Sequence, residues 1–107
     1  MEERTQRIIG INTLGLLKAL TLTVECEEDE ENGMYIMQAK EFPYAVEYDE
    51  SYAVCREKLI RSLKEWAMNL AADFESWKAG REHEIPYLLM LLISSESEIN
   101  ECLRYEK

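Results

Sequence analysis

The feature that most constrains the fold of this chain is a long amphipathic pattern that begins after Ser51. Apolar or small residues recur there every three or four positions, which places them along one side of an α-helix. Ser51 can cap the first turn, and Gly80 stands where a left-handed residue commonly ends a helix. The pattern predicts one helix over residues 51–79, about 40 Å long at 1.5 Å per residue. Its apolar positions are Tyr52, Cys55, Leu59, Leu63, Trp66, Leu70, Phe74 and Trp77.

A helix of this length would extend beyond a small sheet. Phe74 and Trp77 lie on its distal part and need another element or a second subunit to cover them. The apolar tail segment that contains Leu89 and Leu92 could pair between subunits in the same way. We therefore expect a homo-oligomer, a dimer or larger, with these four residues at its interface.

The stretch before the helix predicts an antiparallel meander over residues 19–48. Residues 19–26 alternate between apolar and polar, which is the pattern of a half-buried strand. The acidic run that follows ends in Asn32 and Gly33, which can supply the positive φ angles of a tight hairpin turn. Residues 34–42 then read as the returning strand, and apolar residues on both of its faces favour a central position.

Pro43 interrupts pairing because it lacks an amide donor, and residues 44–48 read as a short third strand.

The tail, residues 85–107, is open to two interpretations. Residues 85–93 could be a fourth strand or a helix opened by Pro86, and we favour the strand. Ser95 with Glu98 forms a capping-box pattern, which predicts a final short helix.

Residues 1–18 show no clean period and are expected to form an irregular, buried N-terminal extension. An apolar fraction of 47% in 107 residues suffices for one core. We therefore predict a single α+β domain over residues 1–107, in which a three- to four-stranded, mostly antiparallel sheet packs against one long helix.

The net charge of −10, from 22 acidic and 12 basic residues, limits the class of partner. Such a field repels phosphate backbones and anionic lipids, which argues against direct binding to nucleic acid or membranes. It attracts basic proteins, although acidic surfaces also serve solubility alone. Three cysteines without a CxxC spacing, no secretory signal and no apolar run near 20 residues favour a reducing, cytoplasmic location.

No catalytic, cofactor-binding or metal-binding residue is predicted. His83 is the single histidine and lies in a charged loop. The run 27–31 lacks the alternating oxygen ligands of a calcium loop. An RNase H-type nuclease needs a carboxylate in the middle of the first strand, where the chain offers only Glu25 near the strand's end. A non-enzyme is expected, and metal-dependent nuclease activity would contradict this.

Residues that are charged, exposed or at a sheet edge are the candidates for binding a partner. The acidic run supplies four of them, and tyrosines on the third strand supply two, since Tyr44 and Tyr48 would share one face of an edge strand. Tyrosines in such positions more often close a small core. The candidates are Glu27, Glu28, Asp29, Glu30, Tyr44 and Tyr48.

The stretches LTLTVECEEDEENGMYIMQAKEFPYAVEY and DESYAVCREKLIRSLKEWAMNL, followed by the polar link KAGREHEIP, resemble the HicB-like antitoxin family over about residues 20–86. Tyr44 and Asp49 replace two glycines of that pattern, and no C-terminal DNA-binding module matches. The resemblance implies a partial RNase H-like sheet without catalytic carboxylates, which oligomerises and neutralises a small basic RNA-cleaving toxin of the HicA type by occlusion. The alternative is a self-assembling structural or small-ligand-binding domain without a toxin partner.

Overall fold

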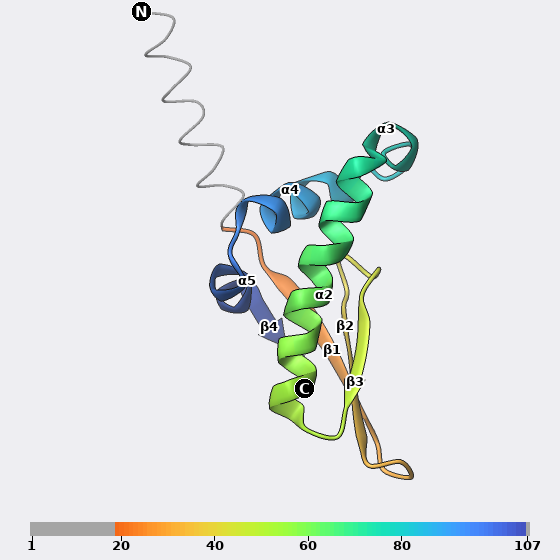
Figure 1. Ribbon diagram of the computed structural model, residues 1–107, viewed down its shortest axis with the longest axis vertical. Helices are drawn as coiled ribbons and strands as arrows, with labels where there is room; N and C mark the ends of the chain where they lie inside the picture. The colour runs from red at the N-terminus through yellow and green to blue at the C-terminus, as the bar shows by residue number, and fades with distance from the viewer. Residues whose placement is uncertain (1–18, 107) are drawn as a thin grey trace, which may run out of the picture.

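The computed structural model of the 107-residue chain describes residues 19–106 (Figure 1). The expected irregular extension over residues 1–18 lies outside the described residues. Among residues 19–106, no helix is long and apolar enough to cross a membrane.

The chain forms an α+β fold around one mixed sheet. Strands β1 (Leu22–Asp29), β2 (Met34–Ala39) and β3 (Val46–Asp49) pair in sequence as an antiparallel meander. A fourth strand, β4 (Leu103–Tyr105), pairs in parallel with β1, so that the strand order is β3-β2-β1-β4. The predicted central position of the returning strand is confirmed, since β2 lies between β3 and β1.

The β1–β2 turn differs from the predicted tight turn. Residues 30–33 separate the strands, and Gly33 has a φ of +64° while Asn32 does not adopt a positive φ. The Asn32 side-chain amide instead donates to Asp29 Oδ2 at 2.7 Å. Strand β1 also extends beyond the predicted residue 26, because the carboxylates at positions 27–29 stand on a projecting hairpin where water can reach them.

Helix α2 (Tyr52–Ala72) accounts for most of the predicted helix. The Ser51 side chain accepts a hydrogen bond from the Val54 amide at 3.3 Å and caps it as expected. The prediction of one continuous helix to residue 79 is wrong, because Asp73 leaves the helical conformation at φ −119° and ψ 35°. A separate short helix, α3 (Phe74–Trp77), follows and places Trp77 beside the sheet's loops.

The preferred interpretation of residues 85–93 as a strand is also wrong. They form helix α4 (Ile85–Ile93), which follows a 3₁₀ turn, η1 (Glu82–Glu84), and has Pro86 in its first turn. A run that is apolar at every position carries no period that separates strand from helix. Packing between α2 and the sheet decides the outcome, since it buries Leu88, Met90 and Leu91 from this helix.

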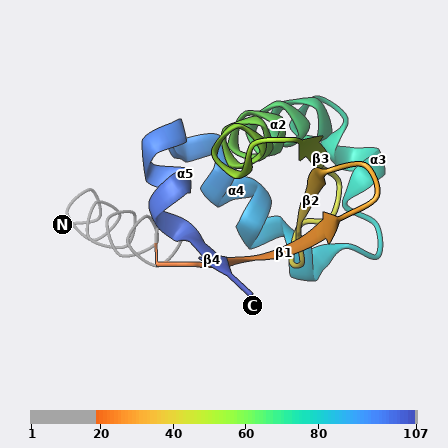
Figure 2. The same cartoon turned by 90° about the horizontal axis from the view of Figure 1, so that it is seen from below.

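Helix α5 (Glu96–Cys102) follows, and both hydrogen bonds of the Ser95–Glu98 capping box are present. The fourth strand therefore comes after this helix and not before it. Helices α2, α4 and α5 lie on one side of the sheet, and Figure 2 shows them above β1 and β4.

The core lies between these helices and the sheet. It is formed by alternate residues of the strands and by one side of each helix. The fully buried apolar side chains are Leu22, Val24, Met37, Ala39, Phe42, Ala45, Cys55, Leu59, Leu63, Ala67, Leu88, Met90, Leu91 and Ile99.

Candidate protein-binding surface

The four predicted acidic residues lie together at the end of the β1–β2 hairpin. Glu27, Glu28 and Asp29 are the last residues of β1, and Glu30 begins the turn. The hairpin projects beyond the end of α2 (Figure 1). Hydrogen bonds from the Asn32 side chain and backbone lower the pKa of Asp29. These carboxylates therefore form a negatively charged projection that another protein can reach.

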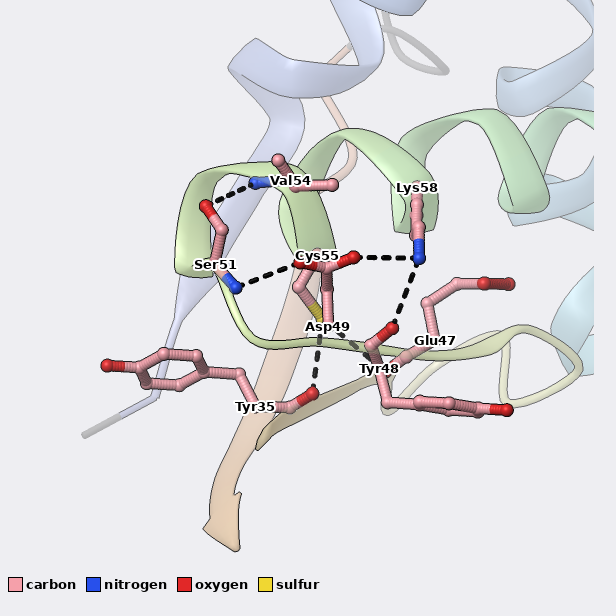
Figure 3. Close-up of polar contacts among 8 residues, drawn as sticks. All are labelled: Tyr35, Glu47, Tyr48, Asp49, Ser51, Val54, Cys55 and Lys58. Carbon is pink, nitrogen blue, oxygen red and sulfur yellow. Dashed lines mark hydrogen bonds and ion pairs between the residues drawn. The ribbon is translucent and has the colours of Figure 1, made fainter. Parts of the chain in front are cut away.

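Tyr48 is an exposed edge residue, as predicted. It lies on β3, the edge strand, and its side chain is 62% exposed. Its ring points away from α2 (Figure 3). The neighbouring position Val46 is 49% exposed and was missed by the sequence analysis, although its alternation with Tyr48 along the third strand was a signal for it.

Tyr44 does not share a strand face with Tyr48, so that part of the prediction is wrong. Strand β3 begins at Val46, and Tyr44 lies in the preceding loop. Its hydroxyl donates to Glu84 Oε2 at 2.7 Å and accepts from Trp77 Nε1 at 3.0 Å. Burial, together with the Glu84 carboxylate, raises the pKa of Tyr44. Tyr44 therefore connects the loop before β3 to α3 and η1.

The four residues expected at an oligomer interface differ in their exposure to solvent. Trp77 is 6% exposed and covered by its own chain, so that its burial requires no second subunit. Phe74 is half-buried against Trp77, with ring centroids 6.0 Å apart. On α4, Leu89 is 40% exposed and Leu92 is half-buried. An interface role for these residues stays a prediction, and Leu89 is the most open of the four.

A network at the junction of β3 and α2 holds Tyr48 in place (Figure 3). Asp49 accepts from the Ser51 amide at 2.9 Å and forms an ion pair with Lys58 at 2.8 Å. Lys58 Nζ also donates to the Tyr48 carbonyl at 3.4 Å. The ion pair lowers the pKa of Asp49 and raises that of Lys58. The edge strand is thereby fixed to the first turns of the helix.

Cys55 strengthens the same junction from the buried side. Its Sγ lies 3.5 Å from the Tyr35 carbonyl and 3.4 Å from the Glu47 carbonyl, so that one thiol contacts both β2 and β3. Burial raises the pKa of the Cys55 thiol, which disfavours the nucleophilic thiolate. The buried position of Cys55 supports a packing role.

The described part of the chain shows no group of three or more His, Cys, Asp or Glu side chains that could hold a metal ion. His83 lies exposed in η1. A shallow hollow of about 420 Å³ borders Tyr52, Arg56 and Asn100. Arg56 there donates to Asn100 Oδ1 from Nε at 3.0 Å and lies 5.0 Å from the Tyr105 ring centroid. These contacts join α2 to α5 and β4.

One solved structure is similar to this chain over most of its length. It is described as the antitoxin part of a proposed toxin/antitoxin system from Syntrophomonas wolfei subsp. wolfei. The two chains share 26% sequence identity with a TM-score of 0.75, over 88% of this chain and 68% of the other. No protein-family model and no curated protein matches the sequence. The similarity supports an antitoxin-like fold.

Proposed function

We propose that this chain is an antitoxin that binds a toxin protein and neutralises it by covering the toxin's active surface. The observation that carries the proposal is the similarity, at a TM-score of 0.75 over 88% of the chain, to the antitoxin from Syntrophomonas wolfei. The sequence resemblance to HicB-like antitoxins points in the same direction from different evidence. It suggests a HicB-like chain acting in the cytoplasm on a small basic RNA-cleaving toxin of the HicA type.

The charge distribution supports a basic partner. The chain carries a net charge of −10, and the hairpin residues from Glu27 to Glu30 project from the body of the molecule. Complementary charge accelerates the encounter of two proteins and disfavours partners of like charge. A basic RNA-binding toxin has the complementary surface. In this proposal the chain itself is not a catalyst, and Glu27, Glu28, Asp29, Glu30 and Tyr48 contact the toxin.

Co-expression tests the proposal directly. The partner to use is the small, lysine- or arginine-rich protein encoded by the reading frame next to this one. We expect that protein to arrest growth alone, and this chain to restore growth and to co-purify with it. Absence of a complex at physiological salt would overturn the antitoxin function. Mg²⁺-dependent RNA cleavage by this chain alone would instead favour a hydrolase.

A second candidate function is a self-assembling domain without a toxin. It is favoured by exposed apolar side chains on α4, where Leu89 and Ile93 are 40% and 38% exposed one helical turn apart. Sedimentation of the purified chain would separate the two candidates. Stable oligomers that Leu89→Ser dissociates, together with no affinity for the neighbouring basic protein, would support assembly alone.

A further inference from the structure

The side of the sheet that faces away from the helices combines apolar and acidic residues in an ordered way. Helices α2, α4 and α5 cover the other side (Figure 2). On this helix-free side, Val46 is 49% exposed and Tyr48 is 62% exposed. Large apolar side chains that are exposed side by side commonly mark a contact with another protein.

Strand register sets these residues in two rows across the sheet, because directly paired residues project from the same face. The first row is Glu27, Ile36 and Tyr48, and the second is Glu25, Gln38 and Val46. Each row has a carboxylate on β1 and an apolar side chain on β3. Two strand spacings separate these groups by about 10 Å, and alternate positions along a strand separate the rows by about 7 Å.

The two carboxylates of these rows are not engaged in ion pairs within the described part of the chain. Glu25 and Glu27 are both exposed, and no ion pair joins either of them to another residue between 19 and 106. They repel each other across one strand face, and the acidic hairpin tip continues the same charge. A basic partner would relieve this repulsion, whereas an acidic partner or a second copy of this chain would increase it.

Other surfaces of the molecule fit such a partner less well. The edge of β3 is only four residues long, and Lys58 already binds the Tyr48 carbonyl there. The exposed side of α4 is apolar at Leu89 and Ile93 and offers no charge of its own element to a basic protein.

We infer that the helix-free face of β1, β2 and β3 is the surface that binds the toxin, an inference that rests on the function proposed above. The partner presents an apolar side chain that packs on Val46 and Tyr48. It also presents two basic side chains, about 7 Å apart and about 10 Å from the apolar one, that pair with Glu25 and Glu27. Tyr48 is the anchor of this contact, since exposed tyrosines at interfaces commonly carry much of the binding energy.

The test measures binding of the full-length chain to the basic protein encoded by the adjoining reading frame, by calorimetry at physiological salt. One variant removes the charges (Glu25→Gln with Glu27→Gln), and another removes the apolar anchor (Val46→Thr with Tyr48→Ala). The matched control is Glu57→Gln with Glu65→Gln, at exposed positions of α2. We expect each variant of the sheet face to raise Kd about tenfold or more, and the control to change it by less than about twofold.

Carboxyl footprinting of the unmodified chain provides a measurement that does not depend on how a variant folds. Modification with a carbodiimide and a small amine should be suppressed in the complex at Glu25 and Glu27 and unchanged at Glu57 and Glu65. If the complex forms but the sheet-face variants bind like the wild type and Glu25 and Glu27 stay reactive, this docking surface is wrong while the antitoxin function stands. If no complex forms with the wild-type chain, the antitoxin function itself fails.

Discussion

At the scale of single residues, Tyr44 shows how one hydroxyl can join distant parts of this chain. It satisfies the Glu84 carboxylate, which is 7% exposed, and the indole N–H of Trp77 at the same time. Buried polar groups are costly when they lose their partners. The hydroxyl therefore links the loop before β3 to α3 and η1.

Replacing Tyr44 by phenylalanine should destabilise the fold. The change keeps the ring but leaves both Glu84 Oε2 and Trp77 Nε1 without this partner, so we expect a loss of about 1–3 kcal/mol in the free energy of unfolding. Urea denaturation followed by tryptophan fluorescence measures it. The control Tyr48→Phe alters an exposed ring and should stay within about 0.5 kcal/mol of the wild type. Equal effects of the two changes would contradict this role of Tyr44.

The Asp49–Lys58 ion pair makes a pH-dependent contribution. The pKa of Asp49 is lowered, chiefly by the hydrogen bond from Lys58, so its stabilisation is present above the unfolded value of about 3.9 and is lost as pH falls through the lowered pKa. The pKa of Lys58 is raised, chiefly by the bond to Asp49. Its stabilisation is present below about 10.4 and is lost as pH rises through the raised pKa.

We therefore expect the urea midpoints of the wild type and Asp49→Asn to differ most between about pH 5 and pH 9, and to converge in acid and in strong alkali. Parallel denaturation series across pH measure this difference. Glu50→Gln is the control, because Glu50 is an exposed neighbour that forms no ion pair in the described region. A constant difference between wild type and Asp49→Asn at every pH would show that the ion pair does not contribute.

At the scale of elements, the β1–β2 turn depends on backbone conformation more than on contacts. Gly33 has a φ of +64°, and a Cβ at this position would meet no atom within 4 Å. The left-handed conformation costs a residue with a side chain about 1–2 kcal/mol, whereas asparagine tolerates it better. The turn is therefore limited by the φ angle and not by space.

Gly33→Ala should lower the free energy of unfolding by about 1 kcal/mol, and Gly33→Asn should lower it by less. Thermal unfolding of the two variants and the wild type provides the comparison. Because a Cβ at this position meets no neighbour, the comparison of alanine with glycine isolates the backbone contribution. If Gly33→Ala lowered the free energy of unfolding no more than Gly33→Asn does, the turn would be changing its conformation without cost.

At the scale of the whole molecule, the net charge of −10 is the property that acts over distance. The proposed basic partner would be attracted before any contact forms, and salt screens this attraction over a length of about 10 Å at 0.1 M. Raising the ionic strength from about 0.05 M to about 0.5 M should lower the association rate constant about tenfold or more. Stopped-flow mixing measures it, and a salt-independent rate would contradict electrostatic steering.

Local signals account for the parts of the fold that were predicted from the sequence. The cap at Ser51 and the capping box of Ser95 and Glu98 each depend on neighbours within a few residues. Gly80 has the predicted left-handed conformation, with a φ of +76°, but lies in the turn after α3 and does not end a helix that continues from Ser51. The acidic hairpin residues and the exposed Tyr48 were identified for the same reason, because strand alternation and carboxylate runs are visible in the chain itself.

Long-range contacts decided the parts of the fold that were not predicted from the sequence. The break at Asp73 allows Trp77 to reach Tyr44, a residue 33 positions away. Residues 85–93 are apolar at every position, and only burial against α2 and the sheet makes them a helix.

The sequence by itself determined an acidic α+β chain with a capped amphipathic helix and a projecting acidic hairpin, because caps, periods and charge are properties of neighbouring residues. Only the tertiary structure decided that β4, three residues without a local signal, pairs in parallel with β1. It alone also decided that Glu25, Glu27, Val46 and Tyr48 share one face, since cross-strand register depends on packing between distant segments.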